Sequence, residues 1–165
     1  MKPHRILVPV KGDVIDDEAV QLACTLAAGR EQRGKPRTTI EIIYVIEVPR
    51  ALPLDADLPD EVAKGETALT HAESLTHGLN VMVETEILQA RTVGAAIVDE
   101  AVERGAGTII MAAQYRRRLG EFNMGLTLPY VLKNAPCRVL ITRAPSRAEL
   151  SAVPAARGTN GQQHT

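Results

Sequence analysis

A strand, a basic loop, a helix and a second strand follow one another near the end of the chain, and this order constrains the fold more than any other feature. Residues 108–113 are an unbroken apolar run, typical of a strand that is covered on both faces. Residues 114–123 are polar and charged and are expected to form a loop. Apolar residues then recur at helical spacing over residues 126–134 until Pro136, since proline disfavours helical geometry in the residue before it. Residues 137–143 are expected to form the last strand.

The same alternation of strand and helix signals runs through the rest of the chain, without internal repeats. Apolar and helical periodicities predict strands over residues 5–10, 38–46 and 81–88, and helices after an N-cap at Asp13, over 60–77 and over 93–104. Five strands and four helices in this order predict an α/β fold with an open parallel sheet. The residues expected in its core include Val8, Val10, Ile110, Met111 and Leu140.

Composition supports this fold class and excludes several functions. Hydrophobic residues make up 45% of the chain and aromatic residues only 2%, so the core must be built from aliphatic side chains. That mix suits a sheet beneath helices better than an aromatic-rich sandwich. The net charge of −1 provides no general attraction for nucleic acid or acidic membranes. No run approaches the ~20 apolar residues of a membrane span, so we expect no direct membrane insertion and a cytoplasmic protein.

The length of 165 residues fits one domain and a tail. Residues 1–145 carry all the strand and helix signals and are expected to be the folded domain. Residues 146–165 are rich in Ser, Ala, Gly, Gln and Pro, and we expect a disordered C-terminal tail there because few large apolar residues offset the ordering entropy. Cys24 and Cys137 are expected to pack as small hydrophobic side chains.

The residues that most often carry chemistry do not form a catalytic or metal-binding pattern. His71 and His77 are six residues apart, a poor spacing for joint ligation. Asp16, Asp17 and Glu18 are expected to be solvated carboxylates that the dipole of their helix favours, rather than a cation site. No serine lies in a nucleophile elbow. We therefore expect neither an enzyme nor a metal site.

Three features of the chain occur together in a known family. The first strand ends in Val8-Pro9-Val10 with Gly12 soon after, a proline-rich loop (49–59) follows the second strand, and residues 130–140 close the fold. With these features, residues 5–143 resemble the universal stress protein family. The resemblance implies an adenine nucleotide α-hydrolase-like fold, with a five-stranded parallel sheet of order 3-2-1-4-5 and four helices on both faces.

The resemblance also implies partners and ligands. Family members pair as homodimers through the last strand, which here offers Cys137, Arg138, Val139, Leu140, Ile141 and Thr142. One subgroup binds ATP or AMP, and a second subgroup binds no nucleotide. ATP or AMP is therefore the cofactor to test, although none is certain.

The implied strand order places a ligand crevice between the first and fourth strands, where the order reverses. The loop that begins at Lys11 and the loop that follows Ala112 would form its two sides. The candidate ligand-binding residues are Val10, Lys11, Gly12, Ala112, Tyr115, Arg116, Arg117, Arg118, Gly125, Leu126 and Thr127.

In nucleotide-binding members an aspartate after the first strand contacts adenine, and the motif Gly-x-x-Gly, nine residues, Gly-Ser/Thr wraps the ribose and phosphates. The matching positions here hold Lys11, Ala112, Tyr115, Gly125 and Leu126. Lysine has no acceptor for an adenine amine, a tyrosine adds bulk where glycine lets phosphate approach, and leucine has no hydroxyl, although a threonine follows it. The pattern therefore predicts a degenerate nucleotide site.

Two interpretations of Arg116, Arg117 and Arg118 stay open. Guanidinium groups just before a helix would suit phosphate, which favours an altered anion site. Alternatively, the three arginines are solvated and pair with acidic side chains such as Glu121.

Residues 121–130 are also similar to stress-protein domains appended to amino-acid and cation transporters. Three functional hypotheses follow. The chain is a non-enzymatic stress-response domain with a degenerate site, an ATP- or AMP-binding stress protein with weak ATPase activity, or a cytoplasmic regulatory module that binds a transporter or a signalling protein.

Overall fold

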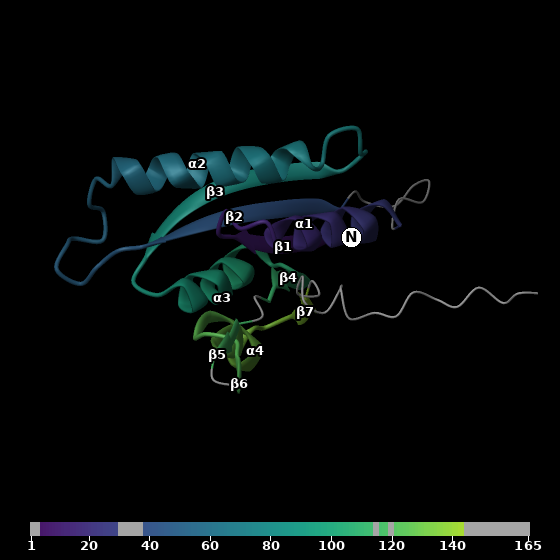
Figure 1. Cartoon of the computed structure of the whole chain (residues 1–165). Helices are drawn as coiled ribbons and strands as arrows, with labels where there is room; N and C mark the ends of the chain where they lie inside the picture. The colour runs from purple at the N-terminus through teal and green to yellow at the C-terminus, as the bar shows by residue number, and fades with distance from the viewer. Residues whose placement is uncertain (1–3, 30–37, 114–115, 119–120, 144–165) are drawn as a thin grey trace, which may run out of the picture.

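A five-stranded parallel sheet forms the centre of the computed structural model, which describes residues 4–29, 38–113, 116–118 and 121–143. In the order in which they lie side by side, the strands are β3 (Met82–Ala90), β2 (Thr39–Glu47), β1 (Arg5–Val10), β4 (Thr108–Ala112) and β7 (Arg138–Thr142) (Figure 1). This confirms the predicted parallel sheet of order 3-2-1-4-5. β3 and β7 are the two edge strands of this sheet.

Four helices cover the two faces of the sheet in pairs. They are α1 (Asp16–Ala28), α2 (Pro59–Ser74), α3 (Val93–Arg104) and α4 (Thr127–Asn134). Side chains of α1 and α2 share one core with Ile6 and Val8, whereas side chains of α3 and α4 share a second core with Leu7. Figure 1 shows α2 on one side of the sheet and α3 and α4 on the other. Successive side chains of a strand point to opposite faces of the sheet, so one aliphatic strand contributes side chains to both cores.

The predicted core is largely confirmed. Val8, Val10, Ile110 and Met111 are all buried. Leu140 is only half-buried, which corrects the prediction for this residue. It lies on β7, and because β7 is an edge strand with a neighbour on one side only, its side chains are covered less completely than those of β1 and β4.

Two local predictions were wrong. The polar stretch predicted as a loop contains strands β5 (Arg116–Arg118) and β6 (Glu121–Asn123), which pair antiparallel. Two residues separate the strands in the sequence, which is the spacing of a tight hairpin. The prediction missed it because a run of polar and charged residues is more typical of a loop. Helix α1 begins at Asp16 with Ile15 at its N-cap position, rather than after a cap at Asp13.

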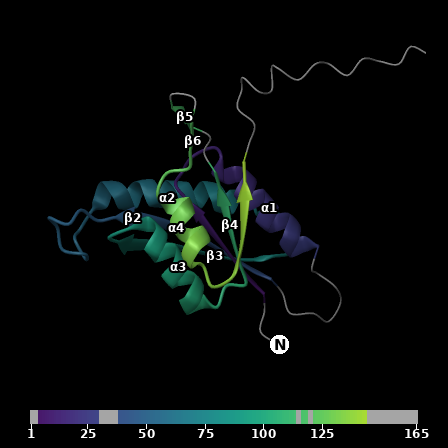
Figure 2. The ribbon, with the colours of Figure 1, turned by 90° about the horizontal axis from the view of Figure 1, so that it is seen from below.

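The hairpin of β5 and β6 projects beyond the ends toward which β4 and β7 point (Figure 2). It therefore lies at the carboxyl edge of the sheet, the edge that carries ligands in open α/β folds. The predicted tail, residues 146–165, lies outside the described residues. Among the described helices, none is both long and apolar enough to cross a membrane.

Close packing of α3 on α4 depends on a glycine. A Cβ added at Gly94 would lie 2.9 Å from Cδ1 of Tyr130 and 3.1 Å from its Cβ. We expect Gly94→Ala to destabilise the fold by about 1–3 kcal/mol, because this overpacking outweighs the ~1 kcal/mol that alanine gains in helix propensity. Denaturant unfolding measures the loss, with Gly29→Ala as the control, since a Cβ at Gly29 meets nothing closer than 3.4 Å. Equal stability of the two variants would contradict this packing.

Candidate functional site

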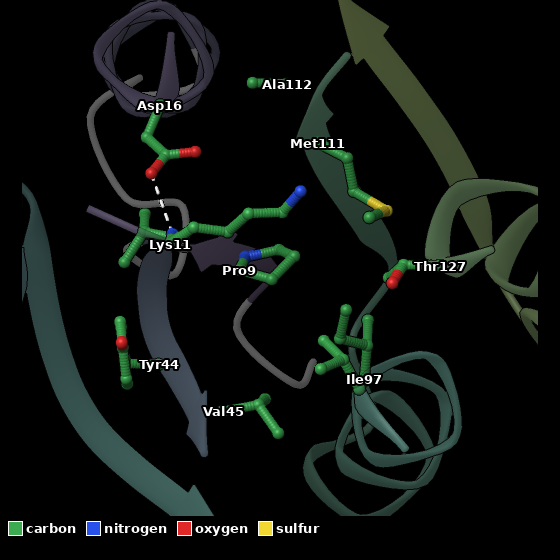
Figure 3. A pocket seen from close by; sticks show the side chains of 11 residues that line it. Pro9, Lys11, Asp16, Tyr44, Val45, Ile97, Met111, Ala112 and Thr127 are labelled. Carbon is green, nitrogen blue, oxygen red and sulfur yellow. Dashed lines mark hydrogen bonds between the residues drawn. The ribbon is translucent and has the colours of Figure 1, made fainter. Parts of the chain in front are cut away.

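A cavity of about 180 Å³ opens at the carboxyl edge of the sheet, where β1 and β4 diverge. This is the place at which the strand order reverses, so the crevice predicted from the sequence is present. Figure 3 shows the side chains around the cavity. The lining residues come from the ends of β1, β2 and β4 and from α1, α3 and α4, and they are Pro9, Val10, Lys11, Asp16, Tyr44, Val45, Val93, Ile97, Met111, Ala112 and Thr127.

The buried carboxylate of Asp16 holds the loop that leaves β1. Its Oδ2 accepts backbone N–H bonds from Lys11 at 2.7 Å, Gly12 at 2.9 Å and Asp13 at 3.0 Å. The φ angle of Gly12 is 89°, in the left-handed region that glycine enters without strain. This turn aims three amide groups at one oxygen and fixes where the Lys11 side chain leaves the backbone.

The environment of Asp16 corrects the expectation of a solvated carboxylate, because this residue is only 6% exposed. Burial raises the pKa of its carboxyl above 3.8, while the backbone N–H bonds from Lys11, Asp13 and Gly12 pull the pKa in the opposite direction. The sequence missed this role, since three successive acidic residues at a helix start are usually exposed.

We expect Asp16→Ala to destabilise the fold by about 1–3 kcal/mol, because the substitution leaves three backbone N–H groups without the oxygen that they share. Asp13→Ala is the matched control, since Asp13 is exposed. The folded-state pKa of Asp16 is raised, so the contribution of its titration is full below 3.8 and is lost as pH rises through the folded-state pKa. The stability gap between wild type and Asp16→Ala should therefore widen as pH falls, and a gap that narrows in acid would contradict the raised pKa of Asp16.

Lys11 places a cation at the cavity. Figure 3 shows its side chain extended across the space, toward the side on which Met111 and Ala112 lie. The salt bridges among the described residues do not include its ammonium group. Thr127, the first residue of α4, places a hydroxyl on the wall formed by α3 and α4. Most of the remaining wall is aliphatic, so the cavity combines one cation, one hydroxyl and an apolar surface.

A larger and more open groove, of about 750 Å³, adjoins this cavity between the start of α1 and helix α2. Lys11 and Tyr44 line both spaces. At the groove His71 Nε2 lies 2.9 Å from Asp17 Oδ1, an ion pair when the histidine is protonated. The sequence did not predict this groove, because its floor comes from small residues of α2 that carry no motif, such as Ala63 and Ala68.

The structure brings together part of the predicted site. Val10, Lys11, Ala112 and Thr127 line the cavity, and Gly12 lines the adjoining groove. Gly125 has a φ of 69°, which explains why a glycine stands there.

Of the other predicted residues, one lies away from the cavity and the rest have side chains that the structure does not describe. Leu126 is 92% exposed and does not line the cavity. Tyr115 lies outside the described residues, and Arg116, Arg117 and Arg118 are described only as the backbone of β5. The main residues that the sequence missed are Asp16, Tyr44, Val45, Ile97 and Met111, of which the last four have the pattern of ordinary core positions.

Both cysteines are free thiols away from the cavity. Cys24 is buried and Cys137 is half-buried, and burial raises the pKa of each thiol. A raised pKa lowers the thiolate fraction, so both residues act as small hydrophobic side chains, as predicted. Within the described part of the chain, no group of three His, Cys, Asp or Glu residues is arranged to hold a metal ion.

Comparison with known proteins places this geometry in context. Residues 3–143 match the model of the Universal stress protein family. Universal stress protein MJ0531 of Methanocaldococcus jannaschii is 26% identical over 149 residues, which cover 87% of this chain and 84% of that protein.

Solved structures share the fold. A universal stress protein from Archaeoglobus fulgidus superimposes with a TM-score of 0.68 at 16% identity, covering 86% of this chain and 98% of that one. A universal stress protein family protein from Arabidopsis thaliana, solved with AMP bound, gives a TM-score of 0.62 at 15% identity, covering 87% of this chain and 94% of that one. At these identities the likeness shows the fold alone.

Proposed function

This chain belongs to the universal stress protein family, and from that premise we propose that it is a non-enzymatic stress-response domain whose crevice has lost the adenine nucleotide of its relatives. The observation that carries the proposal is Lys11. In the motif of the nucleotide-binding subgroup this position is an aspartate that accepts from adenine. An ammonium donates only, so it leaves the adenine amine without a partner.

Two further positions support the same proposal. Ala112 stands at the end of β4 where the motif has its first glycine, and its Cβ adds bulk where a glycine would let phosphate approach closely. Leu126 replaces the hydroxyl residue of the motif with a side chain that accepts and donates nothing. Thr127 retains a hydroxyl one residue later, on the cavity wall.

The test is the small-molecule content of the purified protein. We expect mass spectrometry of the heat-released fraction to find no ATP or AMP above the level of an Asp16→Ala variant, in which the loop loses the acceptor of three backbone N–H groups. Stoichiometric ATP or AMP released from the wild-type protein would overturn the proposal.

A second function, ATP or AMP binding with weak ATPase activity, is favoured by a separate observation. The cavity and the groove adjoin at Lys11 and Tyr44 and together exceed the roughly 300 Å³ at which ligand pockets begin. Arg117 and Arg118 on β5 would then supply the phosphate contacts that the missing glycines do not. Micromolar ATP binding that is lost in Arg117→Ala, Arg118→Ala would favour this function over the first.

A third function is that of a cytoplasmic regulatory module bound to a transporter or a signalling protein. Three apolar side chains are exposed around the start of α4, within and beside the segment that resembles transporter-associated domains: Met124, Leu126 and Tyr130. Exposed apolar residues that gather on one element are typical of docking surfaces. Binding of the protein to a candidate transporter's cytoplasmic domain should be lost in Leu126→Ser, Tyr130→Ser, and binding that is unchanged would exclude this surface.

A further inference from the structure

The ammonium group of Lys11 places a positive charge at the 180 Å³ cavity. No salt bridge among the described residues includes this group, and Figure 3 shows the side chain reaching across the cavity. The nearest acidic side chain in the lining, Asp16, uses its Oδ2 for three backbone N–H bonds rather than for Lys11. The cation is therefore available to a ligand.

The opposite wall of the cavity supplies a second polar contact and an apolar surface. The hydroxyl of Thr127 comes from the first residue of α4. Met111 and Ile97 also line the cavity, with Val45 on the wall formed by β2. A ligand that matches these walls has an apolar body and one acidic group.

The size of the cavity limits the ligand. At about 180 Å³ the space holds about six water molecules and lies below the roughly 300–1,000 Å³ of most ligand pockets. A single ring with one acidic substituent fits this volume, whereas a whole nucleotide would have to extend into the groove beside α2.

We propose that this cavity binds a small organic anion, with its carboxylate or phosphate group at the Lys11 ammonium and the Thr127 hydroxyl and its apolar body against Met111, Ile97 and Val45. The inference rests on the proposed loss of adenine nucleotide from the same crevice. Lys11 is then the specificity-determining residue. The aspartate of the family motif accepts a hydrogen bond from the adenine amine, whereas the Lys11 ammonium donates one to an acidic group. The charge-assisted hydrogen bonds of an ammonium to an acid are stronger than those of neutral pairs.

Isothermal calorimetry with four probes tests the proposal on the full chain. Benzoate and phenyl phosphate carry a ring and an acid, benzyl alcohol carries the ring alone, and inorganic phosphate carries the acid alone. We expect one of the two ring acids to bind at least about tenfold more tightly than either single-feature probe, the equivalent of one charge-assisted hydrogen bond. Which ring acid binds more tightly identifies the acidic group as carboxylate or phosphate.

Two variants complete the test. Lys11→Met keeps the length of the side chain without its charge and should lower the affinity for the ring acid by at least about tenfold. Lys133→Met removes an exposed lysine from the last turn of α4, outside both spaces, and should change nothing. Melting temperatures establish that both variants are folded. Equal binding by wild type and Lys11→Met, or no heat from either ring acid, overturns the inference.

A parallel titration with AMP separates this inference from the proposed function. If AMP binds the wild-type protein at micromolar concentration, the proposed loss of nucleotide is wrong. If AMP and both ring acids give no heat, the loss of nucleotide stands and the anion site is wrong. Binding of a ring acid through Lys11, without binding of AMP, supports both.

Discussion

Val139→Pro is expected to be a monomer and to stay folded, whereas the wild-type protein, as we propose, pairs through β7 into a homodimer. β7 is an edge strand of the sheet, bonded to β4 on one side only, and an exposed edge offers backbone groups to a second copy of the chain. The carbonyl of Thr142 accepts from the N–H of Ala113 at 2.7 Å, so Thr142 faces β4. Because backbone groups alternate in direction along a strand, Val139 and Ile141 face the open edge.

The geometry of the edge makes this variant selective. Proline at position 139 removes an N–H from the open edge and leaves the bonds between β7 and β4 in place, and proline is tolerated on edge strands for that reason. Light scattering during gel filtration measures the mass. Val139→Ala is the matched control, since it shortens the side chain and keeps the N–H, and it should remain a dimer. An unchanged mass for Val139→Pro would exclude pairing through β7.

We expect ATP and AMP to give no measurable heat with the wild-type protein. A micromolar affinity corresponds to about 8 kcal/mol. One hydrogen bond whose partner stays buried and unpaired costs about 1–3 kcal/mol. Relative to the family motif, the residues at positions 11, 115 and 126 remove an acceptor, add bulk and remove a hydroxyl, and under the proposed function these changes would together offset most of that affinity.

The fold could be predicted because each strand and helix leaves a local pattern in the sequence, although the sheet that the strands form joins residues far apart in the chain. Continuous aliphatic runs such as residues 108–113 belong to strands buried on both faces, and β4 is buried in this way. The same reasoning overestimated the burial of Leu140, since the run of β7 is equally aliphatic but lies at an edge. Hydrophobicity alone does not distinguish a central strand from an edge strand.

The site was predicted in part, for a similar reason. Position along the chain located Lys11 and Ala112, because Lys11 follows β1 and Ala112 ends β4, the two strands between which the strand order reverses. Asp16 was missed, since its burial depends on a tight turn at Gly12 that folds the backbone over it. Tyr44 and Ile97 were missed because an aliphatic or aromatic wall residue has the same sequence pattern as a core residue.

We propose above all that Lys11 changes what the crevice of this stress-protein fold can bind. The most direct measurement is calorimetric titration of AMP into wild type and into Lys11→Asp, Leu126→Ser, which restores the acceptor and the hydroxyl of the family motif. We predict no heat with the wild-type protein and measurable binding with the double variant. Micromolar binding of AMP to the wild-type protein, unchanged or weakened in the double variant, would contradict the claim.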